Sequence, residues 1–448
     1  MGIAPGTKVL FANFPADGHF NPLTGLAAYL KAAGCDVRWY TSTHYAKKIA
    51  ALDIPFFPLR KAVDVNAAVD LEEIFPDRKK VKSQVAKLKF DMKHVFILRG
   101  PEFYSDIEDI HREFPFQVMV ADITFGGIPF VRECMEIPVI AINVMPLMEN
   151  SKDLPPSGLG LVPSQSWLGR RKQDVMRYLA NRILFAEPTQ LAHNILRSYG
   201  IDPEGAGIFE LHIRKANVVL QSGTPGFEYK RSDISPNIHF AGPLLSFDKG
   251  NKEQWHDRRL LQYKKVILVT QGTVEKDINK LLVPAIEAFR KSDHLLVVTT
   301  GGSQTQELRD CYEAENVIIE DFIPFRDVMP YADVYVSNGG YGGVLLGVQN
   351  GVPMVVAGVH EGKNEINARI GYFKLGINLK TETPKPESLK KAVETVLEDD
   401  VYKANVVKLM EEFDRYDPNL VLARQLAALL PVPAPRKAAA VASEAFVY

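Results

Sequence analysis

The chain has 448 residues, of which 46% are hydrophobic and 24% charged, so it is long enough to bury two large cores. Its 53 basic and 54 acidic residues give a formal net charge of −1. That balance gives no reason to expect nucleic acid or an anionic membrane surface as a partner.

The cysteines and the histidines point to a protein without disulfides or a metal site. Cys35, Cys134 and Cys311 are scattered and odd in number, which favours a reducing compartment. "HEGKN" begins like a zinc-protease motif, but Asn364 stands where the second histidine would be. "MGIAPGTK" leads straight into an apolar run, and no run of 18 apolar residues occurs. We expect a cytoplasmic protein without stable membrane insertion.

Short apolar runs alternate with amphipathic stretches along the chain. The runs are "KVLFANF", "DVRWYT", "QVMVADI", "VIAINVM", "NVVLQS", "NIHFAG", "KVILVTQG", "HLLVVTTG", "NVIIEDFI", "VYVSNGG" and "MVVAGV". Such runs are typical of parallel strands buried on both faces. Residues 21–34 and 278–293 read as intervening helices, the second kinked or shortened by Pro284. The alternation predicts an α/β protein with doubly wound, Rossmann-like sheets.

The runs fall into two units. We expect an N-terminal domain over 1–229, a polar linker rich in Pro and Gly over 230–254, and a C-terminal domain over 255–416. A helix at about 417–430 is expected to pack back on the first domain, and 431–448 is a low-complexity tail. Helical insertions at 58–114 and 151–198 interrupt the first unit, either as a binding wall or as extra packing.

"NFPADGHFNP" places His19 between the first predicted strand and a helix expected to start near Asn21. The positive end of that helix favours the neutral imidazole, which is the form that accepts a proton. A base also needs an orienting carboxylate, and Asp122 ends another predicted strand of the same sheet. The alternatives are a packing role for His19 and a cap or loop anchor for Asp122.

The second unit contains two turns that suit a phosphate. "SNGGYGGVLLGVQNGVP" has glycines at 339, 340, 342 and 343, where backbone N–H groups can approach an anion at a helix N-terminus. "TQGTVEKD" offers the N–H of Gly272 and the hydroxyl of Thr273. A tight packing turn and a plain helix cap by Thr273 are the alternatives.

Two further stretches of this unit suit a base and a sugar. In "EDFIPFRD", Phe322 could stack on a nucleobase, although a core phenylalanine is equally common. In "AGVHEGKNEINARI", His360, Glu361, Lys363 and Asn364 offer donors and acceptors for sugar hydroxyls, or form a solvated loop.

The ordered set "GHFNP", an Asp about 100 residues later, "QGT", "FIP", the Gly-rich stretch ending in "NGVP" and "EGKNEINAR" resembles the UDP-glycosyltransferase family over nearly the whole chain. The resemblance implies two facing Rossmann-like domains with a cleft between them (the GT-B fold) and an inverting transfer. It implies that His19 is the general base and that Asp122 orients it. The donor contacts it implies are Gly18, Gly272, Thr273, Phe322, Ile323, Asn338, Gly339, Gly340, Tyr341, Gly342, Gly343, Gln349, Glu361, Lys363 and Asn364.

This sequence departs from the family pattern at several donor positions. Asn338 replaces the usual histidine, and Gly342 and Gly343 replace Asn-Ser, which shifts phosphate contacts from side chains to the backbone. Leu346 stands where a ribose-binding glutamate is expected, with Gln349 nearby as a substitute. Lys363 and Asn364 stand in place of the family's Asp-Gln pair.

The implied reaction moves a sugar, preferably glucose, from a UDP-sugar to a hydroxyl of a small apolar acceptor such as a polyphenol, terpenoid or polyketide. No metal and no cofactor beyond this co-substrate are expected. Phe20, Phe125, Met145 and Met148 are expected to form apolar surface around His19. The alternatives are a non-hydrolysing nucleotide-sugar epimerase and a catalytically silent sugar-nucleotide-binding protein. The sequence does not give the oligomeric state.

Overall fold

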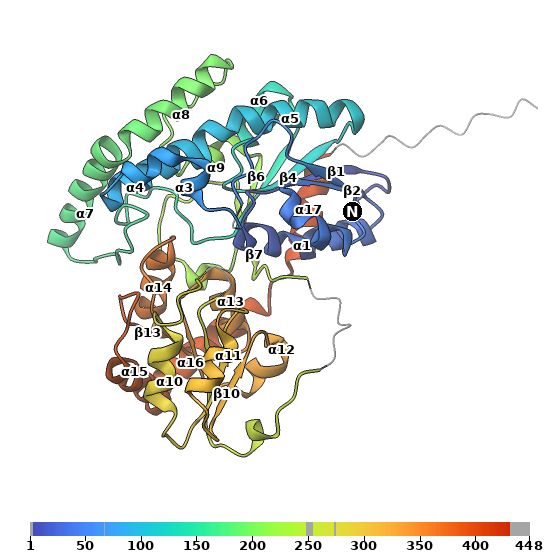
Figure 1. Ribbon diagram of the computed structural model, residues 1–448. Helices are drawn as coiled ribbons and strands as arrows, with labels where there is room; N and C mark the ends of the chain where they lie inside the picture. Colours follow the sequence, from blue (N-terminus) through green and yellow to red (C-terminus); the bar gives the residue numbers. More distant parts are fainter. Residues whose placement is uncertain (1–2, 67, 248–253, 273–274, 431–448) are drawn as a thin grey trace, which may run out of the picture.

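The computed structural model of the protein describes residues 3–66, 68–247, 254–272 and 275–430. Figure 1 shows two α/β halves, one above the other, each built around its own sheet. The prediction of two parallel-sheet α/β domains is confirmed.

The N-terminal sheet has seven strands in the order β3-β2-β1-β4-β5-β6-β7, and every adjacent pair is parallel. In chain order they are β1 (Lys8–Ala12), β2 (Asp36–Thr41), β3 (Phe56–Pro58), β4 (Val118–Asp122), β5 (Val139–Asn143), β6 (Val218–Ser222) and β7 (Ile238–Gly242). Both faces of the central strands are buried, which explains their continuous apolar runs.

The C-terminal sheet has six parallel strands in the order β10-β9-β8-β11-β12-β13. They are β8 (Val266–Thr270), β9 (Leu295–Thr299), β10 (Val317–Glu320), β11 (Val334–Ser337), β12 (Met354–Val356) and β13 (Gly376–Asn378). All eleven predicted apolar runs contain strands. The runs missed β3 and β13, which are three-residue edge strands too short to give a continuous apolar signal.

Helices cover both sheets. The N-terminal half carries α1 (Asp17–Ala32), α2 (Ala46–Ala50), α3 (Leu71–Ile74), α4 (Gln84–Asp91), α5 (Gly100–Glu113), α6 (Ile128–Cys134), α7 (Trp167–Leu179), α8 (Ala186–Ser198) and α9 (Leu211–Lys215). Two π-helical segments, η3 (Met92–Phe96) and η5 (Ala180–Leu184), continue α4 and α7. The C-terminal half carries α10 (Leu282–Phe289), α11 (Thr305–Cys311), α12 (Phe325–Val328), α13 (Tyr341–Gln349), α14 (Lys363–Tyr372), α15 (Pro386–Glu398) and α16 (Asp400–Phe413).

Three predicted boundaries differ from the structure. The helix expected over 21–34 begins at Asp17 and keeps Pro22 inside it, so His19 belongs to its first turn. The helix expected over 278–293 spans only Leu282–Phe289, with Pro284 in its first turn, where a missing N–H is tolerated. The expected linker at 230–254 contains β7, which pairs with β6 and therefore belongs to the N-terminal sheet.

The last described helix, α17 (Pro418–Leu429), returns to the N-terminal half, where Figure 1 shows it in red beside α1. Its Leu422 and Leu426 are fully buried in the cluster that also contains Leu23 and Leu26 of α1. The two halves are therefore joined both by the chain between the sheets and by this helix.

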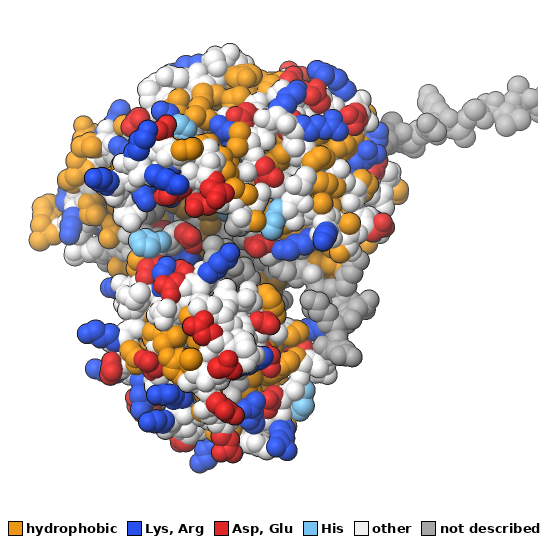
Figure 2. Space-filling model, viewed as in Figure 1, with side chains coloured by type: hydrophobic (Ala, Val, Ile, Leu, Met, Phe, Trp, Pro, Cys, Tyr) orange, Lys and Arg blue, Asp and Glu red, His pale blue; other side chains and the backbone are white. Residues whose placement is uncertain are grey.

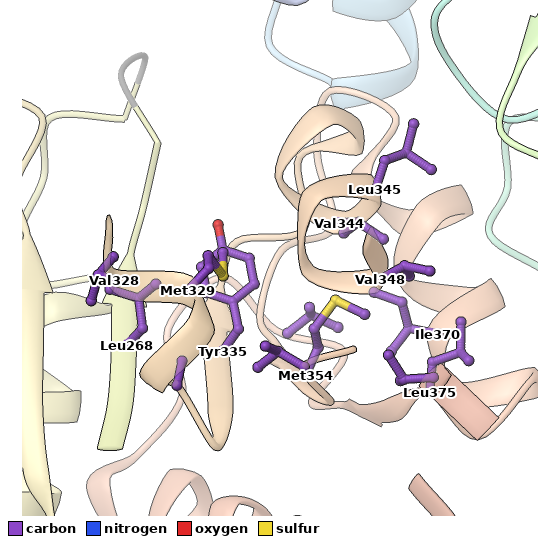
Figure 3. Packing of buried hydrophobic residues seen from close by; sticks show 14 of the residues in the cluster. Leu268, Val328, Met329, Tyr335, Val344, Leu345, Val348, Met354, Ile370 and Leu375 are labelled. Atoms are coloured by element: carbon purple, nitrogen blue, oxygen red, sulfur yellow. The ribbon is translucent and has the colours of Figure 1, made fainter. Parts of the chain in front are cut away.

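The C-terminal core supports the helix that follows the glycine-rich turn. Figure 3 shows Val344 and Val348 of α13 on the side that faces Met354 and Leu375, and all four are buried in one cluster. This packing, which also includes Tyr341 at the start of the helix, fixes the axis of α13.

Candidate active site

Each sheet reverses its strand order at one point, and the candidate residues gather there. In the N-terminal sheet β1 lies between β2 and β4, and in the C-terminal sheet β8 lies between β9 and β11. An open parallel sheet forms a crevice at such a point, beyond the carboxyl ends of its strands. The predicted residues that follow β1, β4, β8 and β11 lie at these two reversal points.

His19 and Asp122 are in direct contact. His19 Nδ1 lies 2.9 Å from Asp122 Oδ1, and the exposed fractions of the two side chains are 19% and 0%. The buried carboxylate also accepts a hydrogen bond at Oδ2 from the backbone N–H of Phe14, at 2.6 Å. At Oδ1 it accepts the backbone N–H of Thr124 at 2.9 Å and the Thr124 hydroxyl at 2.6 Å. These donors hold Asp122 in one orientation.

The carboxylate selects the tautomer of His19. An ionised Asp122 can only accept hydrogen bonds, so Nδ1 of His19 carries the proton and Nε2 carries the lone pair. No described residue hydrogen-bonds to Nε2. The geometry is therefore that of a general base whose partner fixes its orientation.

Sequence reasoning missed two residues that support this pair. The contact with Thr124 was partly detectable, because an Asp side chain commonly accepts the backbone N–H two residues on. His212 of α9 had no signal: its Nδ1 lies 2.7 Å from the carbonyl oxygen of Ile123, directly after Asp122. Burial lowers the pKa of His212, although the bond to Ile123 and the negative charge of Asp122 act in the opposite direction.

Two of the four predicted acceptor contacts are wrong. Phe20 is fully buried and stacks on Tyr45, with ring centroids 4.4 Å apart. Phe125 is also fully buried and packs on Phe103 at 4.7 Å. Adjacent helical residues are about 100° apart around the axis, so Phe20 points into the core while His19 points out of it. Met145 and Met148 are partly exposed, so their contact with an acceptor remains a proposal.

The buried Phe14 lies beside His19, at the centre of a small apolar cluster. The Phe14 ring meets the imidazole edge-on, with centroids 5.8 Å apart, and stacks on Phe96 at 4.7 Å. Val65 and Val95 belong to the same small cluster. The partly exposed members of this cluster are Ala16 and, from the insertion at 58–114, Leu71, Ile74, Phe75 and Phe96. The insertion therefore supplies an apolar wall next to His19.

On the opposite half, the glycine-rich turn opens α13. Gly340 is its N-cap, and the first helical hydrogen bond runs from the N–H of Val344 to the carbonyl of Gly340 at 3.0 Å. The N–H groups of Tyr341, Gly342 and Gly343 therefore have no acceptor within the helix. A Cβ added at Gly342 would meet nothing within 4 Å, so the approach to these donors is open.

The two predicted phosphate turns touch each other. Asn338 Nδ2 donates to the carbonyl of Gln271 at 2.5 Å, so one of its two amide hydrogens joins the turns. Gly272 has a positive φ of 76°, and Gly339 has no room for a Cβ, which would lie 1.8 Å from Asn367 Oδ1. Thr273 lies outside the described residues.

Tyr341 does not offer its side chain to a ligand. The ring is buried, and its hydroxyl donates to the carbonyl of Ser222 in the other half of the molecule, at 2.7 Å. Burial raises the pKa of this hydroxyl. The prediction that the Tyr341 side chain contacts the nucleotide sugar is therefore wrong, and only its backbone N–H is left for such a contact.

The predicted base-stacking residue is not part of the core. Phe322 is 66% exposed and follows β10, while its neighbour Ile323 is buried. A Cβ added at Gly302, in the turn after β9, would lie 3.4 Å from the Phe322 ring. The aromatic face is thus available at the same edge of the sheet as the phosphate turns.

The residues predicted to bind the sugar make two different kinds of contact. Glu361 and Lys363 pair with each other, Oε2 to Nζ at 2.6 Å. Asn364 instead turns to the N-terminal half, where its Nδ2 donates to the carbonyl of Gly158 at 3.1 Å. The prediction that Asn364 contacts the sugar is therefore corrected: in this structure its side chain connects the two halves.

The remaining predicted donor positions are accessible. Gly18 is exposed in the first turn of α1, next to His19. Gln349 is exposed at the last residue of α13, one helical turn beyond Leu346. Contacts of either residue with a nucleotide sugar remain a prediction.

A buried ionic cluster connects α14 to the N-terminal half. Arg369 donates from Nη2 to Glu228 Oε2 at 2.8 Å and from Nη1 to Glu365 Oε2 at 3.1 Å. The other oxygens of these carboxylates accept the backbone N–H groups of Leu147 and Gly160, at 2.9 and 2.8 Å. Burial acts to lower the pKa of Arg369, but the carboxylates raise it above its ordinary value. Sequence reasoning gave no signal for this cluster.

The two reversal points face a shared boundary. Figure 2 shows the molecule indented between its halves, and α1 contacts α13 across that boundary. The helix that carries His19 and the helix that follows the glycine-rich turn therefore meet at this boundary. Across the described ranges, no three His, Cys, Asp or Glu side chains lie together as metal ligands would.

Comparisons with known proteins agree with this architecture. The family described as "Erythromycin biosynthesis protein CIII-like, C-terminal domain" matches residues 285–428. The chain is 33% identical over 415 residues to 4'-demethylrebeccamycin synthase of Lentzea aerocolonigenes, covering 92% of this chain and 97% of that protein. It is 30% identical over 433 residues to UDP-glucosyltransferase 1 of Beauveria bassiana, covering 91% of this chain and 92% of that protein.

The fold is also that of a solved structure. The glycosyltransferase of kitacinnamycin superposes with a TM-score of 0.73 at 19% identity, covering 96% of this chain and 100% of that one. The two-domain fold is therefore shared with that structure.

Proposed function

Because this chain belongs to the UDP-glycosyltransferase family and is a glycosyltransferase, we propose that it moves glucose from UDP-glucose to a hydroxyl of a small, largely apolar natural product. The contact between His19 and the buried Asp122 carries this proposal. The apolar wall around Phe14 favours an acceptor with aromatic or polycyclic surface. The names of the two relatives, a rebeccamycin-type synthase and a glucosyltransferase, support the same substrate classes.

The proposed step is one in-line displacement. Nε2 of His19 takes the proton of the acceptor hydroxyl as its oxygen bonds to the anomeric carbon. The bond from that carbon to the diphosphate oxygen breaks, and the anomeric configuration inverts. Asp122 stabilises the imidazolium that forms.

The leaving diphosphate gains charge as the bond breaks. The N–H groups of Tyr341, Gly342 and Gly343 at the start of α13 stabilise that charge, and Phe322 stacks on the base. Glu361 and Lys363 are the side chains left to contact the sugar hydroxyls. We place this activity in the cytoplasm, with no metal required.

The first test is a calorimetric titration with UDP, dTDP, UDP-glucose and UDP-N-acetylglucosamine, without acceptor. Selective binding of UDP and UDP-glucose supports the donor assignment, while binding of dTDP alone would replace UDP by a deoxyribonucleotide donor. An acceptor screen with the bound sugar then measures transfer, and the anomeric proton coupling of the product reports inversion. Conversion of UDP-glucose to an epimer without acceptor would contradict the proposal.

A further inference from the structure

Helix α7 and its π-helical continuation η5 carry large apolar side chains on the outside of the molecule. Trp167 and Leu168 are 69% and 72% exposed, and Val175, Tyr178 and Ile183 are also exposed. The face that packs inward holds Gly169, Gln173 and Ala180 instead. This reverses the usual pattern, in which a surface helix turns its large apolar residues to the core.

The outward residues form one stripe. Leu168, Arg171, Val175, Tyr178 and Arg182 follow each other at spacings of three and four, so they share one face of the helix. That face lies away from the inward side marked by Gln173 and Ala180. An exposed apolar stripe of this length indicates an interaction surface rather than scattered exposure.

The stripe itself holds Arg171 and Arg182, and the segment that carries it is basic although the chain as a whole is not. Residues 167–184 contain Arg170, Arg171, Lys172, Arg177 and Arg182 against Asp174 alone, a local net charge of +4 in a chain of net charge −1. Arg177 and Arg171 lie near Asp174, and no described carboxylate pairs with Lys172 or Arg182. The balanced charge of the whole chain therefore concealed a local run of basic residues on one helix.

The end of α4 packs against the inward side of η5. Met92, directly after α4, shares a buried cluster with Ala180 and Phe185, which places α4 near η5. Val85 and Leu88 of α4 are exposed. Lysines at 79, 80, 82, 87 and 89 lie in and just before this helix. Figure 2 shows hydrophobic side chains with Lys and Arg between them at the edge where Figure 1 places α7.

We infer that α7, η5 and α4 form a surface that lies on an anionic lipid membrane. Trp and Tyr with aliphatic side chains suit the boundary between head groups and acyl chains, and Lys and Arg suit anionic head groups. Self-association through this face would bring two surfaces of charge +4 together, which disfavours a second copy as the occupant. Among the described helices none is long and apolar enough to cross a membrane, so the contact is peripheral.

The test is cosedimentation of the full chain with phosphatidylcholine vesicles, with and without phosphatidylglycerol. We expect binding to the anionic vesicles, reduced more than ~10-fold in Leu168→Ser/Ile183→Ser. Leu261→Ser is the matched control, because Leu261 is 71% exposed in the other half. Arg171→Gln/Lys172→Gln/Arg182→Gln should remove the preference for phosphatidylglycerol. A vesicle-induced blue shift of tryptophan fluorescence should be lost in Trp167→Phe.

The inferred membrane contact does not depend on the proposed function. UDP binding, measured on each variant, tests the proposed function separately from vesicle binding. Absence of vesicle binding by the wild type overturns the inference, as does equal binding to neutral vesicles. Concentration-dependent dimerisation that Leu168→Ser/Ile183→Ser abolishes would also overturn it, because the face would then be a protein interface.

Discussion

His19 and Asp122 are 103 positions apart in the chain, yet their side chains meet at 2.9 Å. β1 and β4 are neighbours in the sheet, and the register pairs Ala12 with Ala121, one residue before Asp122. The first turn of α1 then brings His19 back over the end of β4. The pair is therefore a product of strand order at the point where the sheet reverses.

Replacing the imidazole should remove the base without removing the donor site. His19→Ala should lower turnover by at least ~10²-fold and leave the affinity for UDP unchanged, because the phosphate turns lie in the other half. The measurements are single-turnover rates and calorimetry. His256→Ala, an exposed histidine of the C-terminal half, is the control. Near-normal turnover of His19→Ala would remove this residue from the mechanism.

Asp122→Asn tests the orienting role. The amide can present N–H groups to Nδ1 of His19, which favours the tautomer that cannot accept a proton at Nε2. We expect a loss of turnover similar to or smaller than that of His19→Ala, in a protein with an unchanged circular dichroism spectrum. The double variant should lose no more than His19→Ala alone. Additive losses would mean that the residues act independently, and unfolding would mark Asp122 as structural.

Phe322→Ala tests the nucleotide site. Stacking of a base on an aromatic ring contributes about 1–3 kcal/mol, so UDP affinity should fall by about 5- to 150-fold. Because Phe322 is 66% exposed, its removal should leave the unfolding midpoint unchanged. Calorimetric titration gives the affinity, with Leu261→Ala as an exposed control. Unchanged UDP affinity would remove Phe322 from the binding site.

Arg369→Met tests the buried cluster between the halves. The change leaves Glu228 and Glu365 buried without their counter-charge, which costs about 3–5 kcal/mol of unfolding free energy. Denaturant titration measures the loss, and Lys408→Met on the surface of α16 is the control. If Arg369→Met loses no more unfolding free energy than the control, the two carboxylates must instead be paired with other groups or hydrated.

The buried His212 predicts an acid-sensitive stability. Its pKa is lowered by folding, so the unfolded chain binds the proton more tightly and stability falls as the pH drops through about 6.5. The loss stops once the pH is below the pKa of the folded state. His212→Asn keeps a donor for the carbonyl of Ile123 but cannot titrate. Between about pH 5 and 7, the unfolding free energy of His212→Asn should depend less on pH than that of the wild type.

If the wild type and His212→Asn lose stability in parallel on acidification, this histidine is not the titrating group. The difference between the two proteins is the informative quantity, since other carboxylates and histidines titrate equally in both.

The sequence by itself determined the two α/β units, because strands buried on both faces need continuous apolar runs that can be read locally. It also marked the residues whose chemistry depends on a turn between strand and helix, namely His19, Asp122 and the glycines before α13. These features depend on backbone conformation and hydrophobic periodicity over a few residues.

Only the tertiary structure decided how neighbouring side chains divide their roles. Phe14 lies against His19 whereas Phe20 enters the core, because the helix begins at Asp17. Tyr341 and Asn364 bind across the two halves, and α7 leaves its apolar stripe outside. These outcomes depend on packing between segments far apart in the chain, which no local pattern encodes.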